Sequence, residues 1–333
     1  MRNCSRRQWL QPAVLLPLAG ATAAAFPVLS WGQSATAAPV KIIVPYAAGA
    51  ATDTLSRLLA QALGEATGAT YIVDNRSGAG TQIGTRAIAG AAPDGQTLGF
   101  IDTAFAINPG LLGAALPYDT QRDFVPISLM ATAPLVLVVH ASVPARTMRE
   151  FIALAKARPG TLNYGSAGVG SAPHLAGEQL HHAASIDINH VPYRGGSTVL
   201  TDLIGGQIQF GFTTVPTMID HIRAGTVRAL AVTGNTRAAQ LPDVPSMAES
   251  GLGAVDATPF FGLVGPARLA PDHVERLATA ASSAVRTGRL NQRLLELGFV
   301  PVGSTAEAFR TRLAQEIAKW SGVIKAGGIK PNA

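Results

Sequence analysis

The stretch KIIVPYAAGAATDTLSRLLAQAL, residues 41–63, decides the fold class of this chain. The apolar run at 40–46 is typical of a buried strand. A loop of small residues around Gly49 follows, and apolar residues then recur at helical spacing. Either Thr52 or Asp53 is expected to cap the start of this helix by accepting backbone N–H bonds.

The loop between this strand and this helix is a candidate binding site for an anion. Backbone N–H groups at a helix start have no intrahelical partner, and the helix dipole adds partial positive charge there. Small side chains let an anion approach these groups closely. The segment 46–52 is therefore a candidate cradle for a carboxylate or a phosphate. A tight strand-to-helix turn without a ligand is the alternative.

Strand and helix patterns alternate along the rest of the chain. Further strands are expected at 70–75, 96–103, 135–140, 162–167, 188–194, 208–214, 227–234 and 259–266. The first strand-helix-strand units predict a parallel sheet covered by helices. We predict an α/β fold of two domains, 38–138 with 234–333 and 139–233, joined by two chain crossovers. The ligand cleft is expected between them.

Two helical stretches are expected to close the chain. The last one has an apolar stripe at helical spacing, which predicts packing against the core. The residues of this stripe are Phe309, Leu313, Ile317, Trp320 and Ile324.

The N-terminus has the pattern of an export signal. Residues 1–37 contain three arginines and no acidic residue, and prolines interrupt their apolar stretch at 13–29, which disfavours a membrane span. Small residues at 35–37 suit an export peptidase. The motif SRRQWL, 5–10, resembles a twin-arginine signal, and an ordinary Sec signal is the alternative. We expect a periplasmic protein exported by one of these two routes.

Removal of this segment changes what the composition implies. The formal net charge is +6 for the whole chain and falls to +3 when three arginines leave. No long run of Lys or Arg remains, so nucleic acid is not an expected partner. The only cysteine, Cys4, leaves as well, so the mature protein is expected to have no disulfide and no thiol chemistry.

Two more glycine-rich loops follow predicted strands. The segment YGSAGVGSAPH, 164–174, has three glycines and two serines before a predicted helix, and NRSGAG, 75–80, is a third loop of this kind. Neither has the glycine order of a dinucleotide fingerprint or the lysine of a P-loop. Three such loops in two domains favour a ligand site more than one loop does.

The motifs of enzymatic chemistry are weak. The sequence has no G-x-S-x-G elbow and no H-E-x-x-H or H-x-x-x-H pair. Most histidines are expected to pack or cap, and His174 is the one placed beside Ser166 and Ser171. We predict no catalytic residue, no metal ligand and no cofactor. A periplasmic serine hydrolase using these serines is the less favoured alternative.

An ordered set of motifs resembles a known family. The motifs are VPYAAGAATD (44–53), NRSGAG (75–80), APDGQTL (92–98), LPYDTQRDFVPIS (116–128), SAGVGSAPHLAGE (166–178), VPYRG (191–195) and LPDVPSMAESG (241–251). Together they resemble the Bug family of periplasmic solute-binding proteins, the TctC-like receptors of tripartite tricarboxylate transporters. The resemblance implies a two-domain, type II periplasmic-binding-protein fold that closes around a small carboxylate.

The resemblance also implies the residues of the site. In this family, backbone amides of the first strand-to-helix loop hold one carboxylate of the ligand, often with ordered water. The implied positions are Tyr46, Ala47, Gly49, Ala50 and Thr52 in the first loop, Ser166, Gly168, Ser171 and His174 in the serine-glycine loop, and Thr103, Tyr193 and Thr213 near the cleft.

The sequence departs from the usual pattern of the family at two places. Relatives usually have adjacent glycines in the first loop, whereas Ala50 and Ala51 follow Gly49 here. A methyl group at position 50 is tolerated only if φ is negative there. Relatives often have Asp or Asn around Thr213 and Thr214, where an Asp would suit an amino group. Threonine favours a plain carboxylate over an amino acid.

These observations predict a ligand receptor and not an enzyme. We expect a monomer that captures a small carboxylate by domain closure and then docks on the membrane permease subunits of a transporter. A ligand-loaded sensor adaptor for a two-component system is the alternative use of the same fold.

Overall fold

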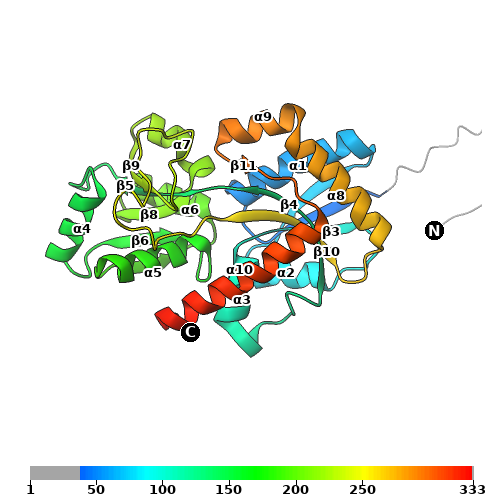
Figure 1. The fold of residues 1–333 in the computed structure, drawn as a ribbon, viewed down its shortest axis with the longest axis horizontal. Helices are drawn as coiled ribbons and strands as arrows, with labels where there is room; N and C mark the ends of the chain where they lie inside the picture. The colour runs from blue at the N-terminus through cyan, green and yellow to red at the C-terminus, as the bar shows by residue number, and fades with distance from the viewer. Residues whose placement is uncertain (1–37, 332–333) are drawn as a thin grey trace, which may run out of the picture. The chain divides into compact units, whose positions relative to one another are not determined.

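The computed structural model describes residues 38–331, which form an α/β fold on two β-sheets (Figure 1). One sheet has six strands in the order β11-β4-β10-β3-β1-β2, and the other has five in the order β7-β6-β8-β5-β9. The predicted export signal, 1–37, lies outside the described residues.

The six-stranded sheet contains the predicted parallel unit. Strand β1 (Val40–Val44) pairs in parallel with β2 (Tyr71–Asn75) and with β3 (Thr97–Asp102). Strand β10 (Phe260–Pro266) then runs antiparallel to β3, so a late part of the chain completes the sheet that the first residues begin.

Strand β4 (Phe124–Thr132) was not predicted from the sequence. It runs antiparallel to β10 and to the short β11 (Val300–Pro301). Most of its residues are buried on both faces, so it lacks the alternation that marks a half-buried strand. The strand contains one buried serine, Ser128. Its Oγ donates to the carbonyl of Ser304, a residue far away in the sequence, at 2.7 Å.

The five-stranded sheet is mixed as well. Strand β6 (Asn163–Ser166) pairs in parallel with β7 (Asn189–Pro192) and β8 (Phe210–Thr214). Strand β5 (Leu135–His140) runs antiparallel between β8 and β9 (Val227–Val232). As a result, the loops after β6 and β8 leave the sheet at the same end.

Helices cover both sheets (Figure 1). Their bounds are α1 (Ala51–Thr67), α2 (Gln82–Ala89), α3 (Ala104–Leu112), α4 (Met148–Ala157), α5 (Ala172–Ala184), α6 (Gly196–Ile204), α7 (Val215–Arg223), α8 (Pro271–Arg286), α9 (Gly288–Leu297) and α10 (Ala306–Gly327), with a short 3-10 turn at Gly113–Ala115.

Two chain segments connect the sheets. The first is the step from β4 to β5, and the second is the long segment 233–259 between β9 and β10. All of β5 lies in the five-stranded sheet, so the chain passes from one sheet to the other before residue 135. The limit between the domains predicted from the sequence is residue 138. The early part of the second segment packs on the five-stranded sheet too, because Ala238 and Leu241 join its core. The domain limits themselves stay a prediction.

The C-terminal part has three helices where the sequence suggested two stretches. Thr287 separates α8 from α9, and Gly288, the first residue of α9, has a φ of +72°. Helix α10 packs against α3 and β4, and its predicted apolar stripe faces the core. The Trp320 ring is fully buried, and its Nε1 donates to Glu316 Oε2 at 2.8 Å. The prediction that the stripe is core packing is therefore confirmed.

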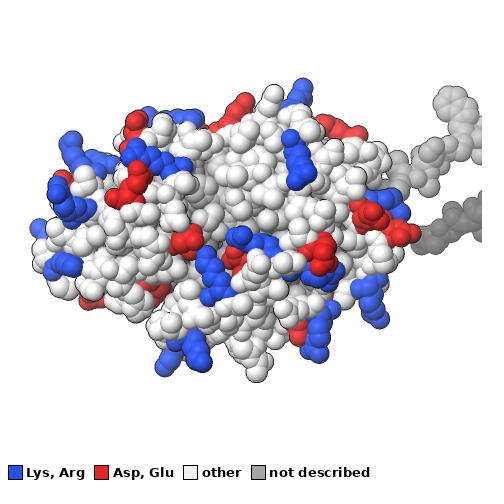
Figure 2. Space-filling model, in the orientation of Figure 1, with Lys and Arg blue, Asp and Glu red and all other residues white. Residues whose placement is uncertain are grey.

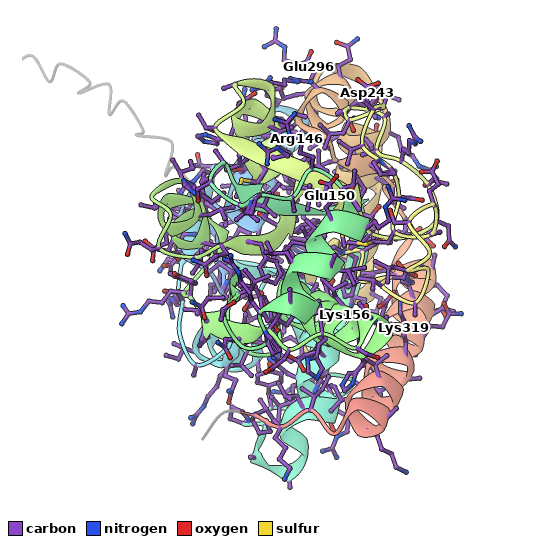
Figure 3. All side chains as sticks on the ribbon, turned by 90° about the vertical axis from the view of Figure 1, so that its left-hand side faces the viewer. Arg146, Glu150, Lys156, Asp243, Glu296 and Lys319 are labelled. Carbon is purple, nitrogen blue, oxygen red and sulfur yellow. The ribbon has the colours of Figure 1, made fainter. Side chains whose placement is uncertain are left out.

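Local polar contacts fix the start of α4. Thr147 Oγ1 accepts from the Glu150 N–H at 3.2 Å, and Glu150 Oε2 accepts from the Arg146 N–H at 2.7 Å. This reciprocal pattern is a capping box, here shifted by one residue. Figure 3 shows Glu150 near one end of the helix and Lys156 towards the other. A carboxylate in the first turn and a cation in the last turn suit the helix dipole.

Charged side chains of both signs are interspersed on the face shown in Figure 2. No continuous basic band crosses that face. Among residues 38–331, no helix has the length and apolar character that a membrane span requires.

Gly262 in β10 provides a test of this packing. A Cβ at this position would overlap the ring of Phe309, and both residues are buried. We expect Gly262→Ala to lower the free energy of unfolding by about 1–3 kcal/mol because the ring has no room to move.

Urea denaturation measures this loss, with Gly322→Ala on α10 as the control. A Cβ at 322 would meet nothing within 4 Å, and alanine favours a helix. Equal stabilities of the two variants would contradict the packing described here.

Candidate functional site

A small cavity of about 50 Å³ lies between the two sheets. The carboxyl ends of β3 and β8 and the loops that follow β1 and β6 converge on it. We call it the inner cavity. It has the position expected of a ligand site in this type of fold, at the carboxyl ends of strands.

Four helices begin at the inner cavity. Its lining includes the first residues of α1, α5 and α6, namely Ala51, Ala172 and Gly196, and the residue before α7, Thr214. The first N–H groups of a helix have no intrahelical partner, and each dipole adds partial positive charge at this end. Two of these groups already have an acceptor, because Ser171 Oγ accepts from His174 N–H of α5 and Pro134 O accepts from Val215 N–H of α7. An anion in the cavity would therefore meet donors and positive potential from both sheets.

The start of α1 is open to such an anion. Its N-cap is Ala50, with φ −83° and ψ 168°, and no side chain caps the helix. The first helical bond runs from Thr54 N–H to Ala50 O at 2.9 Å. The N–H groups of Ala51 and Thr52 therefore have no acceptor within the helix. The prediction that Thr52 or Asp53 caps this helix is wrong. The condition that φ be negative at Ala50 is met.

The amide of Gly49 has a different role from the one the resemblance implied. Gly49 N–H donates to Asp53 Oδ2 at 2.9 Å, so the carboxylate of Asp53 already occupies it. Asp53 also accepts from Arg57 and Asn75. These bonds outweigh burial and hold the pKa of Asp53 below its usual value. These bonds connect the loop to α1 and to β2.

The serine-glycine loop is held by its own hydroxyl groups. Ser171 Oγ donates to the carbonyl of Gly168 at 2.6 Å and, as N-cap of α5, accepts from His174 N–H at 3.4 Å. Ser166 is fully buried, and its Oγ lies 2.6 Å from His190 Nε2. Of these residues, Ser171 reaches the inner cavity and Ser166 does not.

Two histidines stack behind this loop. The rings of His174 and His190 lie 4.2 Å apart between centroids, and His174 Nδ1 accepts from Gly170 N–H at 3.3 Å. Burial lowers the pKa of His174, although Glu178 acts in the opposite direction. Burial, and then the neighbouring His174, lower the pKa of His190 to about 3. Both rings are therefore neutral structural groups at neutral pH.

A second cavity of about 400 Å³ adjoins the inner one and shares Tyr46 and Ala167 with it. We call it the outer cavity. Its lining includes the third glycine-rich loop, residues 77–81, together with Gly168 and Arg194. All three predicted loops therefore meet at the cleft.

The twelve residues implied by the resemblance fall into three groups. Tyr46, Ala50, Thr52, Ser171 and Thr213 line the inner cavity, and Gly168 and Tyr193 line the outer one together with Tyr46. The other five line neither cavity: Ala47, Gly49, Thr103, Ser166 and His174.

Thr103 and Tyr193 make structural contacts. Thr103 is fully buried, and its Oγ1 accepts from the backbone N–H of Phe260 at 2.9 Å. Tyr193 donates its hydroxyl to Asp202 Oδ2 at 2.7 Å, and burial followed by this contact raises the pKa of Tyr193 to about 12.

Sequence reasoning missed Asp102. This residue ends β3 and lines the inner cavity, and its Oδ1 accepts from the Tyr46 hydroxyl at 2.9 Å. Burial raises the pKa of Asp102 to about 6, against hydrogen bonds from Tyr46 and Ala104 that lower it. An acid at the carboxyl end of a predicted parallel strand is the signal that could have identified it.

A larger cavity lies elsewhere. It has a volume of about 1070 Å³ and is a surface groove between α1, α8 and α9. All its lining residues belong to these helices and the turn between α8 and α9, so a ligand there would not contact the five-stranded sheet. Residues 38–331 also hold no group of three or more His, Cys, Asp or Glu side chains placed to bind a metal ion. We therefore place the site in the inner cavity.

Comparison with known proteins supports the fold described above. A family model described as tripartite tricarboxylate transporter family receptor, TctC, matches residues 55–329. The protein BugT of Bordetella pertussis is 34% identical over 88% of this chain and 90% of its own length.

Two solved structures are similar throughout. The periplasmic binding protein BugD has a TM-score of 0.84 at 29% identity, with 88% of this chain and 99% of BugD covered. An R. palustris protein solved with adipate has a TM-score of 0.85 at 30% identity, with 88% of this chain and 98% of that protein covered.

The two sheets, the two connecting segments and the cleft between them define a two-domain periplasmic binding protein of type II. Within this class, the chain belongs to the TctC family, the receptors of tripartite tricarboxylate transporters. The resemblance that the motifs carry is confirmed.

The buried histidine pair predicts a loss of stability in acid. An unfolded His190 has its ordinary pKa near 6.5, whereas the folded one has a pKa of about 3. Between these values the unfolded chain binds more protons, so stability should fall as the pH falls from 6.5 towards 3. Urea midpoints measured from pH 7.5 to 4.5 would show this slope.

The contribution of His190 is isolated by the variant His190→Asn. Its midpoint, relative to the natural chain, should rise as the pH is lowered, whereas His182→Asn, on the exposed part of α5, should follow the natural chain. Parallel pH curves for all three proteins would show that His190 is not buried in its neutral form.

Proposed function

We propose that this protein is a periplasmic receptor that binds a small carboxylate between its two sheets and delivers it to a tripartite tricarboxylate transporter. The observation that carries the proposal is the convergence of four helix starts on the inner cavity. Membership of the receptor family supports the role, and the adipate-bound relative supports a carboxylate as the kind of ligand. The transporter's permease subunits are the expected partner, and the receptor is expected to act as a monomer.

The ligand is expected to favour a closed arrangement of the sheets. Loops from the two sheets already touch beside the cavity, where Ser197 Oγ donates to the carbonyl of Ala48 at 3.4 Å. A carboxylate bonded to the start of α1 and to the start of α5 would bridge the sheets and stabilise this contact. The connecting segments at 133–134 and 233–259 would serve as the hinge.

The affinity that such bonds can supply is moderate. A hydrogen bond to a charged group contributes roughly 1.5–3 kcal/mol. A few of them, less the cost of ordering the ligand and the two sheets, give a dissociation constant on the order of micromolar. That range suits capture of a ligand that must later be released.

The serines near the cleft do not form a nucleophile site, which supports a receptor over a hydrolase. Ser171 reaches the cavity, but its hydroxyl hydrogen is given to Gly168 O. The Nδ1 of His174 accepts from Gly170 N–H and so is not free to take a proton from a serine. Ser166 has a histidine partner, His190, but is fully buried away from the cavity.

The substitution Ala50→Asp tests the proposed carboxylate site. An aspartate at an N-cap accepts from the first N–H groups of its helix, and replacing alanine there typically gains about 1 kcal/mol. The new carboxylate would occupy the donors of α1 and repel an anionic ligand. We expect a chain at least as stable as the natural one that loses carboxylate binding about a hundredfold or more.

The control is Ala270→Asp at the N-cap of α8. This helix also starts at an alanine without a side-chain cap, but Ala270 is exposed and lies outside both cavities. Calorimetric titration with succinate, malate, glutarate and adipate compares the three proteins. Undiminished binding by Ala50→Asp would contradict a carboxylate site at the start of α1.

A further inference from the structure

The inner cavity contains a carboxylate as well as the helix starts. Asp102 Oδ1 accepts from the Tyr46 hydroxyl at 2.9 Å and from the Ala104 N–H at 3.0 Å. These two bonds fix the side chain at the cavity wall. Among residues 38–331, no group donates a hydrogen bond to the second oxygen, Oδ2, so it is left for a ligand.

Asp102 is also the one charged side chain among the described residues that line the inner cavity. The lining has no Lys, Arg or His to balance it, and its other polar side chains are hydroxyls. The Tyr46 hydroxyl is already committed as a donor to Asp102. A ligand that carried only carboxylates would meet a like charge here, which costs free energy at short range.

We propose that Asp102 binds a protonated amino group of the ligand, so that the cargo is an amino acid whose carboxylate lies at the helix starts. This inference rests on the proposed function and deepens it. The carboxylate satisfies the unpaired N–H groups of α1, and the ammonium satisfies Asp102 Oδ2. Both charges in the cavity then have a partner of opposite sign.

The same placement revises what Thr213 and Thr214 suggest. The lack of an acid at these two positions favoured a plain carboxylate over an amino acid. The structure places both threonines in the same cavity lining as Asp102. The acid that suits an amino group is therefore supplied from β3 of the six-stranded sheet instead of from the end of β8.

Binding of such a ligand should depend on pH with a defined sign. Burial raises the pKa of Asp102 to about 6, so its charge is mostly present at pH 7.5 and mostly absent at pH 5. An ammonium binds the charged form, so its affinity should rise with pH across this range. A ligand with carboxylates alone would show the opposite trend.

The surroundings of Asp102 contain few other groups that titrate. Tyr46 faces it from the loop before α1, and Tyr118 acts on Tyr46 in turn, but burial keeps the pKa of both phenols above the usual value. Among the described residues, no titratable side chain enters the lining of the inner cavity from α5, α6, α7, β8 or β10. The adjoining outer cavity contributes one cation to its lining, Arg194.

Matched pairs of ligands test the proposal. Aspartate is compared with succinate, glutamate with glutarate, and 2-aminoadipate with adipate, by calorimetric titration at pH 5 and pH 7.5. We expect at least one amino acid to bind about tenfold or more tightly than its partner without the amino group at pH 7.5. Its affinity should fall roughly tenfold at pH 5.

The variant Asp102→Asn keeps an oxygen that can accept from Tyr46 and Ala104 and removes the charge. It should lose the preference for the amino acid and the pH dependence, with an unchanged melting temperature. Asp187→Asn, at an exposed site beside β7, is the matched control and should keep both.

The outcomes separate this inference from the proposed function. Tighter binding of the plain dicarboxylates by the natural chain, or an unchanged preference in Asp102→Asn, would overturn the role of Asp102 and leave a carboxylate receptor standing. Failure of all six ligands to bind would count against both.

Discussion

Unpaired backbone N–H groups at helix starts are the constraint around which this molecule is built. A buried helix start needs an acceptor, and burial without one costs free energy. Helix α1 begins at Ala50 with no side-chain cap, and three helices of the other sheet begin at the same cavity. We propose that the ligand supplies the missing acceptor, so that its capture also joins the two sheets.

Polar contacts hold the loops before α1 and α5 in place. Asp53 ties the loop before α1 through Gly49, Arg57 and Asn75 and leaves the first N–H groups of α1 without an acceptor. Ser171 and the stacked histidine pair hold the loop before α5, where Ser171 also accepts from His174 N–H. Asp102 differs, because it lines the cavity and only one of its two oxygens accepts a hydrogen bond among the described residues. In the role proposed above, it would add selectivity to a site whose affinity for anions comes from the main chain.

Much of the fold and part of the site follow from the sequence alone. Short apolar runs mark β1 and β3, because parallel strands are buried on both faces and lead into helices. Side chains that act over a distance do not follow in this way. Asp53 looks like a cap in the sequence, yet its carboxylate turns back to Gly49 N–H. The sequence does not identify Asp102 as a site residue, because no local pattern shows that its strand ends at a cavity. The cavity exists only when β1, β3 and β8 come together in the fold.

A crystal structure of the receptor with the ligand that titration identifies examines the whole arrangement at once. The account predicts a ligand carboxylate within hydrogen-bond distance of the backbone N–H of Ala51 or Thr52, with a second contact from the start of α5, α6 or α7. A ligand bound in the groove between α1, α8 and α9, or one that leaves these amides without an acceptor, would contradict it.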